Sequence, residues 1–235
     1  MSVSVIYEDE YCCMVSKPNN VLVHHAHHSR NKSDEDSLLQ LLDKQFDTKI
    51  YPIHRLDRKT SGIILMAKKT EFVSQFQELF TNKEIQKTYV ALVRGFAPAE
   101  IVIDSPVKGR DADVYKEAET KLKTLDKMTL KIPVKPYDSS RYSLVELQPK
   151  TGRLHQLRIH MTKISHPIIG DPKYGDKNHN LMFENEFDCS NLFLHAKSLE
   201  FTHPFTQKKV NVNADFPSDW NKIFKVFNWQ NPIEP

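Results

Sequence analysis

The sequence predicts an α+β fold (mixed α/β) in which a largely antiparallel central sheet is flanked by helices. Many short segments carry the alternating or continuous apolar pattern of strands, whereas helical patterns are few and lie far apart. The chain has 235 residues, of which 39% are hydrophobic and 27% charged, as in a soluble globular protein. No linker-like stretch divides it, so we expect one domain over residues 1–235.

The N-terminal part predicts short strands followed by one helix. Strands are expected at residues 3–6, 12–16 and 21–23, with a turn at 17–20 before the third. Residues 24–36 are polar and predict a loop. Ser37 and Gln40 form a capping-box pattern, which predicts an amphipathic helix from this point to about Phe46.

The next part of the chain predicts two strands separated by a helix. Residues 63–67 form a continuous apolar run, which is typical of a buried strand. Thr70 is expected to cap a helix whose apolar residues share one face: Phe72, Val73, Phe76, Leu79 and Phe80. A strand is expected over residues 86–94, ending at Gly95.

The second half predicts further strands and two helices. Residues 104–138 are charged and mixed in sign, and they predict a long hairpin or an excursion from the core. Strands are expected at 141–149, near 199–201 and near 210–212, and helices over 154–162 and after a capping Ser218. Only six glycines occur; those in the motifs below, at positions 62, 152, 170 and 175, are expected to need positive φ or a close backbone approach.

Composition excludes several classes of protein. The net charge of +3 and the pI near 8.6 are weakly basic and do not by themselves indicate a nucleic-acid partner. Three cysteines form no CxxC pair, which argues against a zinc or redox motif and predicts buried, inert thiols. The N-terminus lacks a secretory signal and no apolar segment approaches a membrane span of roughly 20 residues, so we expect a cytoplasmic protein without a membrane partner.

One carboxylate, Asp57, stands among cations just before the apolar run. Arg55, Arg58 and Lys59 are its neighbours in the sequence His-Arg-Leu-Asp-Arg-Lys-Thr-Ser-Gly. An acid close to a core stays ionised only beside cationic groups, because desolvation alone raises its pKa. On this stretch alone Asp57 is either half of a structural ion pair or a nucleophile.

A second basic cluster surrounds Arg153. Leu154, Leu157 and Met161 are expected to face the core at helical spacing, while Arg153, Gln156 and His160 line another flank near His155 and Arg158. A helix N-terminus beside arginines favours an anion, so the cluster predicts a phosphate or carboxylate site. The alternative is a solvated basic face. An arginine can also hold a carboxylate ionised, which makes an Arg153–Asp57 pair plausible.

Aromatic and histidine residues leave alternatives open. Tyr89 lies in a strand, where an aromatic ring either packs in the core or stacks on a base. The spacing of His24, His25, His27 and His28 is no tetrahedral metal pattern, and a solvated loop is expected. Structural roles are expected for the remaining histidines in motifs, His166, His195 and His203.

Several enzyme classes lack their motifs. His-Arg-Leu-Asp resembles part of a kinase catalytic loop, but Gly62 occupies the asparagine position and no glycine-rich nucleotide loop is present. The chain also has no P-loop, no G-x-G-x-x-G and no G-x-S-x-G. A reaction without a cofactor or metal is therefore favoured.

Taken together, the motifs resemble the RluA family of pseudouridine synthases. The resemblance is carried in order by residues 54–62, 87–89, 150–158, 166–171, 194–196 and 201–205. Residues 140–147 make the chain similar to the TruC subgroup, which modifies uridine 65 of tRNA and has no S4-like domain. Two alternatives are an RluA-type synthase acting on rRNA or on another tRNA site, and a non-catalytic RNA-binding module.

The resemblance implies a fold, a reaction and roles for individual residues. It implies an active-site cleft across the middle of the sheet and isomerisation of uridine to pseudouridine in RNA without a cofactor. Asp57 would be the nucleophile, with attack on the ribose or on the uracil both open. Arg55 would take the space of the flipped base and Tyr89 would stack on the uracil.

The same resemblance implies the remaining binding residues and the partners. Arg153 would pair with Asp57, and Gln156 and Arg158 would contact the substrate. RNA is the expected partner, tRNA in particular. We expect a monomer with no obligatory protein partner, because no interface pattern is visible in the sequence.

Overall fold

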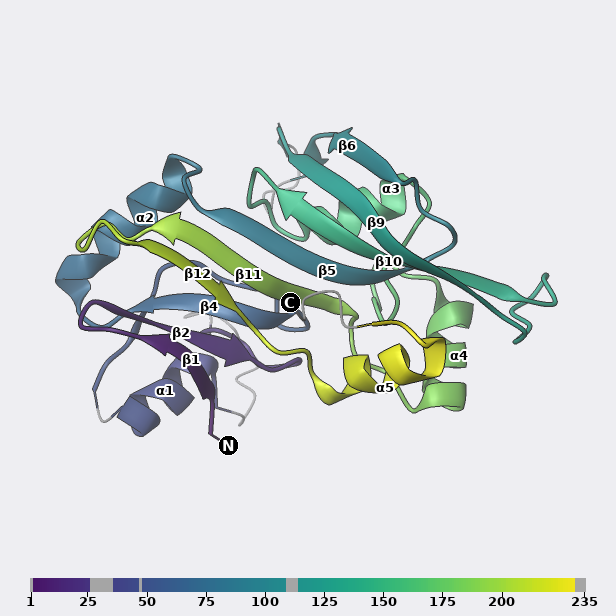
Figure 1. Cartoon of the computed structure of the whole chain (residues 1–235), viewed down its shortest axis with the longest axis horizontal. Coiled ribbons are helices and arrows are strands. Elements are labelled where there is room, and N and C mark those ends of the chain that lie inside the picture. Colours follow the sequence, from purple (N-terminus) through teal and green to yellow (C-terminus); the bar gives the residue numbers. More distant parts are fainter. Residues whose placement is uncertain (1, 26–35, 47, 109–113, 231–235) are drawn as a thin grey trace. The chain divides into compact units, whose positions relative to one another are not determined.

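The computed structural model describes residues 2–25, 36–46, 48–108 and 114–230 (Figure 1). The chain forms two compact units. The first comprises Met1–Lys87 and Ala196–Asp215, and the second comprises Thr88–His195 and Phe216–Pro235. Each unit is therefore assembled from two separate segments of the chain. The prediction of a single domain concerns how these units act together, and it stays a prediction.

The first unit contains a sheet built around one fully buried strand, β4 (Ser61–Ala67). Its other strands are β1 (Ser4–Glu8), β2 (Cys12–Lys17), β3 (Tyr51–Pro52), β12 (Lys209–Asn213) and β11 (Leu194–Thr202), whose first two residues lie in the second unit. The strand order is β1-β2-β4-β11, with β12 beside β11 and β3 beside β4. The pairs β1/β2, β2/β4, β3/β4 and β11/β12 are antiparallel.

Both faces of β4 are covered, as its continuous apolar run predicts. Residues Ile63, Leu65 and Ala67 belong to a hydrophobic cluster with Phe76 and Leu79 of helix α2 (Val73–Thr81). The alternate residues Ile64 and Met66 are also fully buried. Helix α1 (Leu38–Phe46) buries Leu38 and Leu42. The capping box is confirmed, since the backbone N–H of Ser37 donates to Gln40 Oε1 at 2.9 Å and that of Gln40 to Ser37 Oγ at 3.4 Å.

Two local predictions in the first unit are wrong. Residues 21–23 form no strand; instead the carbonyls of Leu22 and Val23 accept hydrogen bonds from Leu38 and Leu39 at the start of α1. Thr70 caps no helix, because a 3₁₀ turn, η1 (Thr70–Phe72), precedes α2 and begins after Lys69 without a side-chain cap.

The second unit contains an antiparallel sheet with strand order β5-β10-β9-β6. The strands are β5 (Gln86–Arg94), whose first two residues lie in the first unit, β6 (Glu100–Asp104), β9 (Glu119–Leu130) and β10 (Ser140–Pro149). Strands β7 (Val107–Lys108) and β8 (Tyr115–Lys116) form a small separate hairpin. The predicted excursion over 104–138 is therefore too long, because β9 pairs along β10 from Thr120 to Leu130.

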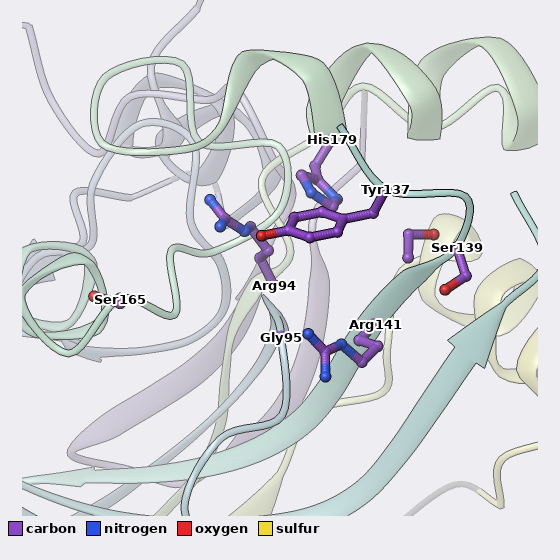
Figure 2. A pocket seen from close by; sticks show the side chains of 8 residues that line it. Arg94, Gly95, Tyr137, Ser139, Arg141, Ser165 and His179 are labelled. Atoms are coloured by element: carbon purple, nitrogen blue, oxygen red, sulfur yellow. The ribbon is translucent and has the colours of Figure 1, made fainter. Parts of the chain in front are cut away.

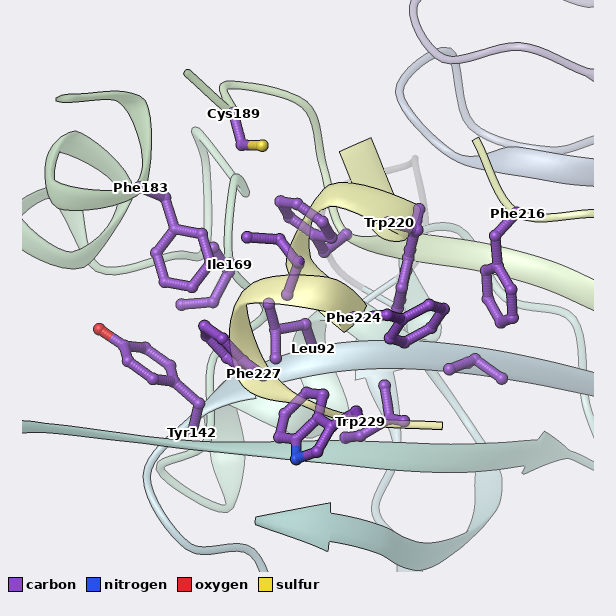
Figure 3. Packing of buried hydrophobic residues seen from close by; sticks show 14 of the residues in the cluster. Leu92, Tyr142, Ile169, Phe183, Cys189, Phe216, Trp220, Phe224, Phe227 and Trp229 are labelled. Carbon is purple, nitrogen blue, oxygen red and sulfur yellow. The ribbon is translucent and has the colours of Figure 1, made fainter. Parts of the chain in front are cut away.

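Helices cover both faces of the second sheet. Alternate residues of β5 enter different clusters, Leu92 on one face and Val93 on the other. Helices α4 (Lys177–Phe187) and α5 (Ser218–Phe227) pack on the Leu92 face, where Figure 3 shows Phe183, Trp220, Phe224 and Phe227 around Leu92. Helix α3 (Gln156–Lys163) packs Leu157 and Met161 into the Val93 cluster.

The observed fold class agrees with the prediction of mixed α and β structure with a largely antiparallel sheet. Helix α4 is missing from the predicted elements, and Ser218 is the first residue of α5 and not its cap. Among the described residues, no helix has the length and apolar character needed to cross a bilayer.

Candidate active site

Asp57 lies on the short connection between β3 and β4. Leu56, beside it, is buried at 5% exposure, and the flanking Arg55 and Arg58 are exposed. A tight turn follows, since the backbone N–H of Thr60 donates to the carbonyl of Asp57 at 3.1 Å. The buried leucine anchors the loop to the core, so that the partly buried Asp57 sits at a fixed point of the loop.

A buried lysine, Lys17, ties this loop to β2. Its side chain is fully buried, and Nζ donates to the carbonyls of Pro18, Val21 and Arg58 at 2.8, 3.0 and 3.0 Å. Burial lowers the pKa of Lys17 to about 7, although the negative charge of Asp57 acts in the opposite direction. Lys17 therefore lies close enough to Asp57 for the two groups to interact electrostatically. The sequence suggested only a turn at this point.

Polar contacts from the turn after Lys17 complete the attachment. Asn19 Nδ2 donates to the carbonyl of Lys59 at 2.6 Å, and Arg58 Nε donates to the carbonyl of Asn20 at 2.9 Å. Together with Lys17, these bonds connect two segments that lie about 40 positions apart in the chain. The Asp57 loop is thus held by backbone carbonyls and not by its own side chains alone.

The start of the motif is held by His54. Its Nε2 accepts a hydrogen bond from the backbone N–H of Leu65 at 3.0 Å, while the N–H of Ile53 donates to the carbonyl of Leu65 at 3.2 Å. An accepting Nε2 requires the neutral ring with its proton on Nδ1. Burial and the nearby charge of Lys87 lower the pKa of His54 to about 3, so that the ring stays neutral.

The backbone conformation and close packing at position 62 explain why the motif ends in a glycine. Its φ of +109° lies in the region that only glycine adopts readily, and an added Cβ would collide with the backbone of Ala196 on β11. The expected close approach is confirmed here. At Gly152 the same expectation is wrong, because an added Cβ would meet open space and φ is not positive.

Arg153 lies on the exposed loop between β10 and α3. Its Nε donates to the carbonyl of Glu117 at 3.0 Å, and its backbone N–H donates to Gln156 Oε1 at 3.1 Å. The neighbouring His155 adopts a left-handed conformation with φ of 54°, and its Nδ1 lies 3.1 Å from the hydroxyl of Tyr174. The loop thus presents an arginine from a backbone that is fixed on both sides.

Gln156 and Arg158 are turned inward. Gln156 is 4% exposed; its Oε1 accepts from Thr151 Oγ1 at 2.6 Å and its Nε2 donates to the carbonyl of Glu119 at 3.0 Å. Arg158 is 5% exposed and makes a bidentate pair with Asp171 at 2.7 and 2.8 Å. That pair and two backbone N–H groups hold the pKa of Asp171 below its usual value, against the effect of burial.

The basic flank predicted from helical spacing is therefore only partly exposed. His160 is fully buried between Thr120 Oγ1 at 3.0 Å and the carbonyl of Ser105 at 2.8 Å. Leu154, expected in the core, is 37% exposed. The solvated basic face is thus reduced to Arg153, since Gln156 and Arg158 already bond within the protein.

The predicted site residues are divided between the two units. Arg55 and Asp57 belong to the first unit, whereas Tyr89, Arg153, Gln156 and Arg158 belong to the second. Tyr89 lies on β5 opposite Leu147 of β10, partly buried against the Val93 cluster. Arg153, Gln156 and Arg158 are brought together by one loop and the helix that follows it.

One group of side chains has metal-ligand chemistry among the described residues: Asp9, Cys12 and His203. Nδ1 of His203 accepts backbone N–H groups of Phe205 and Thr206 at 3.2 and 3.1 Å, so Nε2 carries the proton and faces Asp9 Oδ2 at 3.2 Å. Burial raises the pKa of the Cys12 thiol. This arrangement is a hydrogen-bonded structural cluster, and all three cysteines are buried, as expected.

Comparisons with known proteins agree with the motifs. The sequence model of the family described as RNA pseudouridylate synthase matches residues 11–163. The chain is 39% identical over 239 residues to a tRNA pseudouridine synthase C of Vibrio vulnificus, covering 97% of both chains. It is 38% identical to a protein of the same name from Pasteurella multocida, covering 97% of this chain and 98% of the other.

Solved structures agree in fold. The human RNA pseudouridylate synthase domain containing 4 superposes with a TM-score of 0.74 at 24% identity, covering 96% of this chain and 93% of the other. The human domain containing 1 gives a TM-score of 0.72 at 24% identity, with coverages of 92% and 84%. With a family model that spans residues 11–163 and full-length relatives above 30% identity, this chain belongs to the RNA pseudouridylate synthase family.

Proposed function

We propose that this protein isomerises a specific uridine of tRNA, uridine 65, to pseudouridine without a cofactor. The observation that carries the proposal is the full-length similarity to relatives named tRNA pseudouridine synthase C, at 39% identity over 97% of both chains. The Asp57 loop supports it, because a carboxylate on a loop fixed by a buried lysine is suited to act at one defined atom.

Asp57 is the nucleophile of the proposed reaction. The bond between N1 of uracil and C1′ of ribose breaks and a bond between C5 and C1′ forms. C5 loses its proton and N1 gains one, so that product and substrate are isomers. A carboxylate that attacks the nucleoside divides this exchange into two easier steps.

Binding and positioning roles are divided among the other residues. Arg55 is exposed and enters the space vacated by the flipped base, and Tyr89 stacks on the uracil. Arg153 pairs with Asp57 when the substrate is bound. Gln156 and Arg158 position the Arg153 loop and do not contact RNA themselves, because both are buried and bonded within the protein.

The substitution Asp57→Asn tests the proposal. It keeps the size of the side chain and removes the nucleophile, so pseudouridine at position 65 of a tRNA transcript should fall below detection by chemical mapping. Affinity for tRNA should change little, since phosphate contacts supply most of it. Glu78→Gln, at an exposed position of α2, is the matched control and should retain full activity.

Mapping of total RNA from cells with and without the protein separates the alternatives. Loss of pseudouridine at tRNA position 65 alone supports the proposal. Loss of pseudouridine at a ribosomal position, or at another tRNA position, would mean that the protein catalyses the proposed reaction on a different uridine. An unchanged map together with tight RNA binding would indicate a non-catalytic RNA-binding module.

A further inference from the structure

A pocket in the second unit is lined by no residue that was assigned a role above. It has a volume of about 270 Å³ and is lined by Arg94, Tyr137, Ser139, Ser140, Arg141 and His179, among others. Small-molecule pockets start at roughly 300 Å³, so this one suits a compact group. Figure 2 shows the side chains of Arg94, Arg141 and His179 gathered around the ring of Tyr137.

Two arginines give the pocket its charge. Arg94 Nη1 donates to Asp176 Oδ2 at 2.7 Å and is 41% exposed, so the remaining donors of its fork face outward. Arg141 forms no ion pair with any described residue, and its guanidinium lies over the ring of Phe96 at 5.4 Å. A stacked guanidinium without an acidic partner offers a planar fork that matches the oxygens of a phosphate.

Neutral hydrogen-bond donors complete the lining. Ser140 is 2% exposed, and its hydroxyl lies near the phenol of Tyr142. Burial raises the pKa of that phenol, although Ser140 acts in the opposite direction. The hydroxyl of Tyr142 lies 2.7 Å from His179 Nδ1. Because burial lowers the pKa of His179, the ring is neutral, and one of its two nitrogens carries a proton.

Tyr137 adds a flat aromatic surface at the mouth. Its side chain is 62% exposed, which is unusual for a large apolar ring. Its backbone is nevertheless fixed, because Tyr137 and Val134 exchange reciprocal N–H to carbonyl bonds of 3.1 and 3.0 Å. An exposed ring on a fixed backbone can stack on a nucleic-acid base, a contact worth roughly 1–3 kcal/mol.

We propose that this pocket binds one phosphate group of a nucleotide, with its base stacked on Tyr137. Arg141 and the remaining donors of Arg94 hold the phosphate. The nucleotide belongs to the RNA substrate, a source that rests on the proposed function. The binding of a phosphate group in this pocket does not depend on the proposed function, because a free nucleotide carries the same phosphate and base.

The substitution Arg141→Gln tests the pocket on the full-length protein. Affinity for tRNA, measured by fluorescence anisotropy, should fall about tenfold, and the slope of log affinity against log salt should decrease by about one, since one phosphate contact is lost. Lys225→Gln removes an exposed cation of α5 and serves as the control. Equal affinities and slopes for the two variants would overturn the proposal.

Tyr137 provides an independent variant. Tyr137→Phe should retain affinity, whereas Tyr137→Ala should lower it several-fold without changing the salt slope, because stacking releases no counterions. Equal affinity of Tyr137→Ala and the wild type would remove the stacking contact from the proposal.

Calorimetric titration with uridine 5′-monophosphate and inorganic phosphate distinguishes the sources. One outcome is that the wild type binds the mononucleotide, Arg141→Gln does not, and both bind tRNA equally well. That outcome would assign the pocket to a free nucleotide and overturn the RNA source. A drop in RNA affinity in Arg141→Gln supports the pocket even if uridine 65 is not the target, so the two proposals fail separately.

Discussion

At the scale of single residues, the Asp57 loop is held by the side chains of Lys17 and His54, which make opposite kinds of hydrogen bond. Lys17 donates to three carbonyls, whereas His54 accepts a backbone N–H and must be neutral. Lysine is almost never fully buried, so the core position of Lys17 could not be predicted from the sequence. The Asp57 motif itself was recognisable, because its residues are contiguous. Its supports come from distant parts of the chain.

His54 makes a prediction about pH. Its pKa is about 3 in the folded protein and 6.5 in the unfolded chain, so the unfolded chain binds more protons between these values. The contribution of the neutral His54 ring to the free energy of unfolding is fully present above pH 6.5 and is lost as the pH falls toward 3. His54→Gln replaces the ring with an acceptor that does not titrate. The free energy of unfolding, measured with urea, should therefore decline less between pH 6.5 and 4 in this variant than in the wild type.

The comparison between the two proteins isolates His54, because burial also lowers the pKa of His160, His179 and His203. These residues contribute the same sign of pH dependence to both proteins. Identical slopes in wild type and His54→Gln would show that the His54 ring does not resist protonation in the folded state.

At the scale of elements, the loop before α3 is positioned by the buried pair of Arg158 and Asp171. The helical period predicted that α3 exists and that Leu157 and Met161 face the core, and both hold. It could not predict that Gln156, Arg158 and His160 are also buried, since their partners lie on other elements. Helix α4 escaped prediction because its asparagine-rich sequence buries few apolar residues; Asp176, which caps it, was the available signal.

The Arg158–Asp171 pair predicts a strong coupling. Arg158→Met or Asp171→Asn alone leaves a buried partner without its counterpart, and each should cost about 3–5 kcal/mol of stability. The double variant should cost less than the sum of the two, because it removes both charges. Urea unfolding of the four proteins measures the coupling energy. Additive losses would mean that the two side chains do not act as a pair, and the Arg153 loop would need another support.

At the scale of the whole molecule, each unit is completed only by the later of its two segments. In the first unit, Leu199, Phe201, Val210 and Val212 of β11 and β12 enter the cluster built by residues 12–85. In the second, the segment after Asp215 adds six large side chains to the Leu92 cluster: Phe216, Trp220, Ile223, Phe224, Phe227 and Trp229. The sequence predicted these elements separately, but not that the chain returns from one unit to the other.

Removal of the last segment should therefore unfold the second unit. Six buried aromatic or aliphatic side chains, at roughly 1.5–3 kcal/mol each, contribute on the order of 10 kcal/mol or more. That is as large as the whole stability of a typical domain, about 5–15 kcal/mol. A chain ending at Asp215 should lose hydrogen-exchange protection in β5, β10 and α4, whereas a chain ending at Gln230 should keep it. Native protection of α4 in the shorter chain would show that β5, β10 and α4 fold without α5, and that α5 is an addition to the core and not its closure.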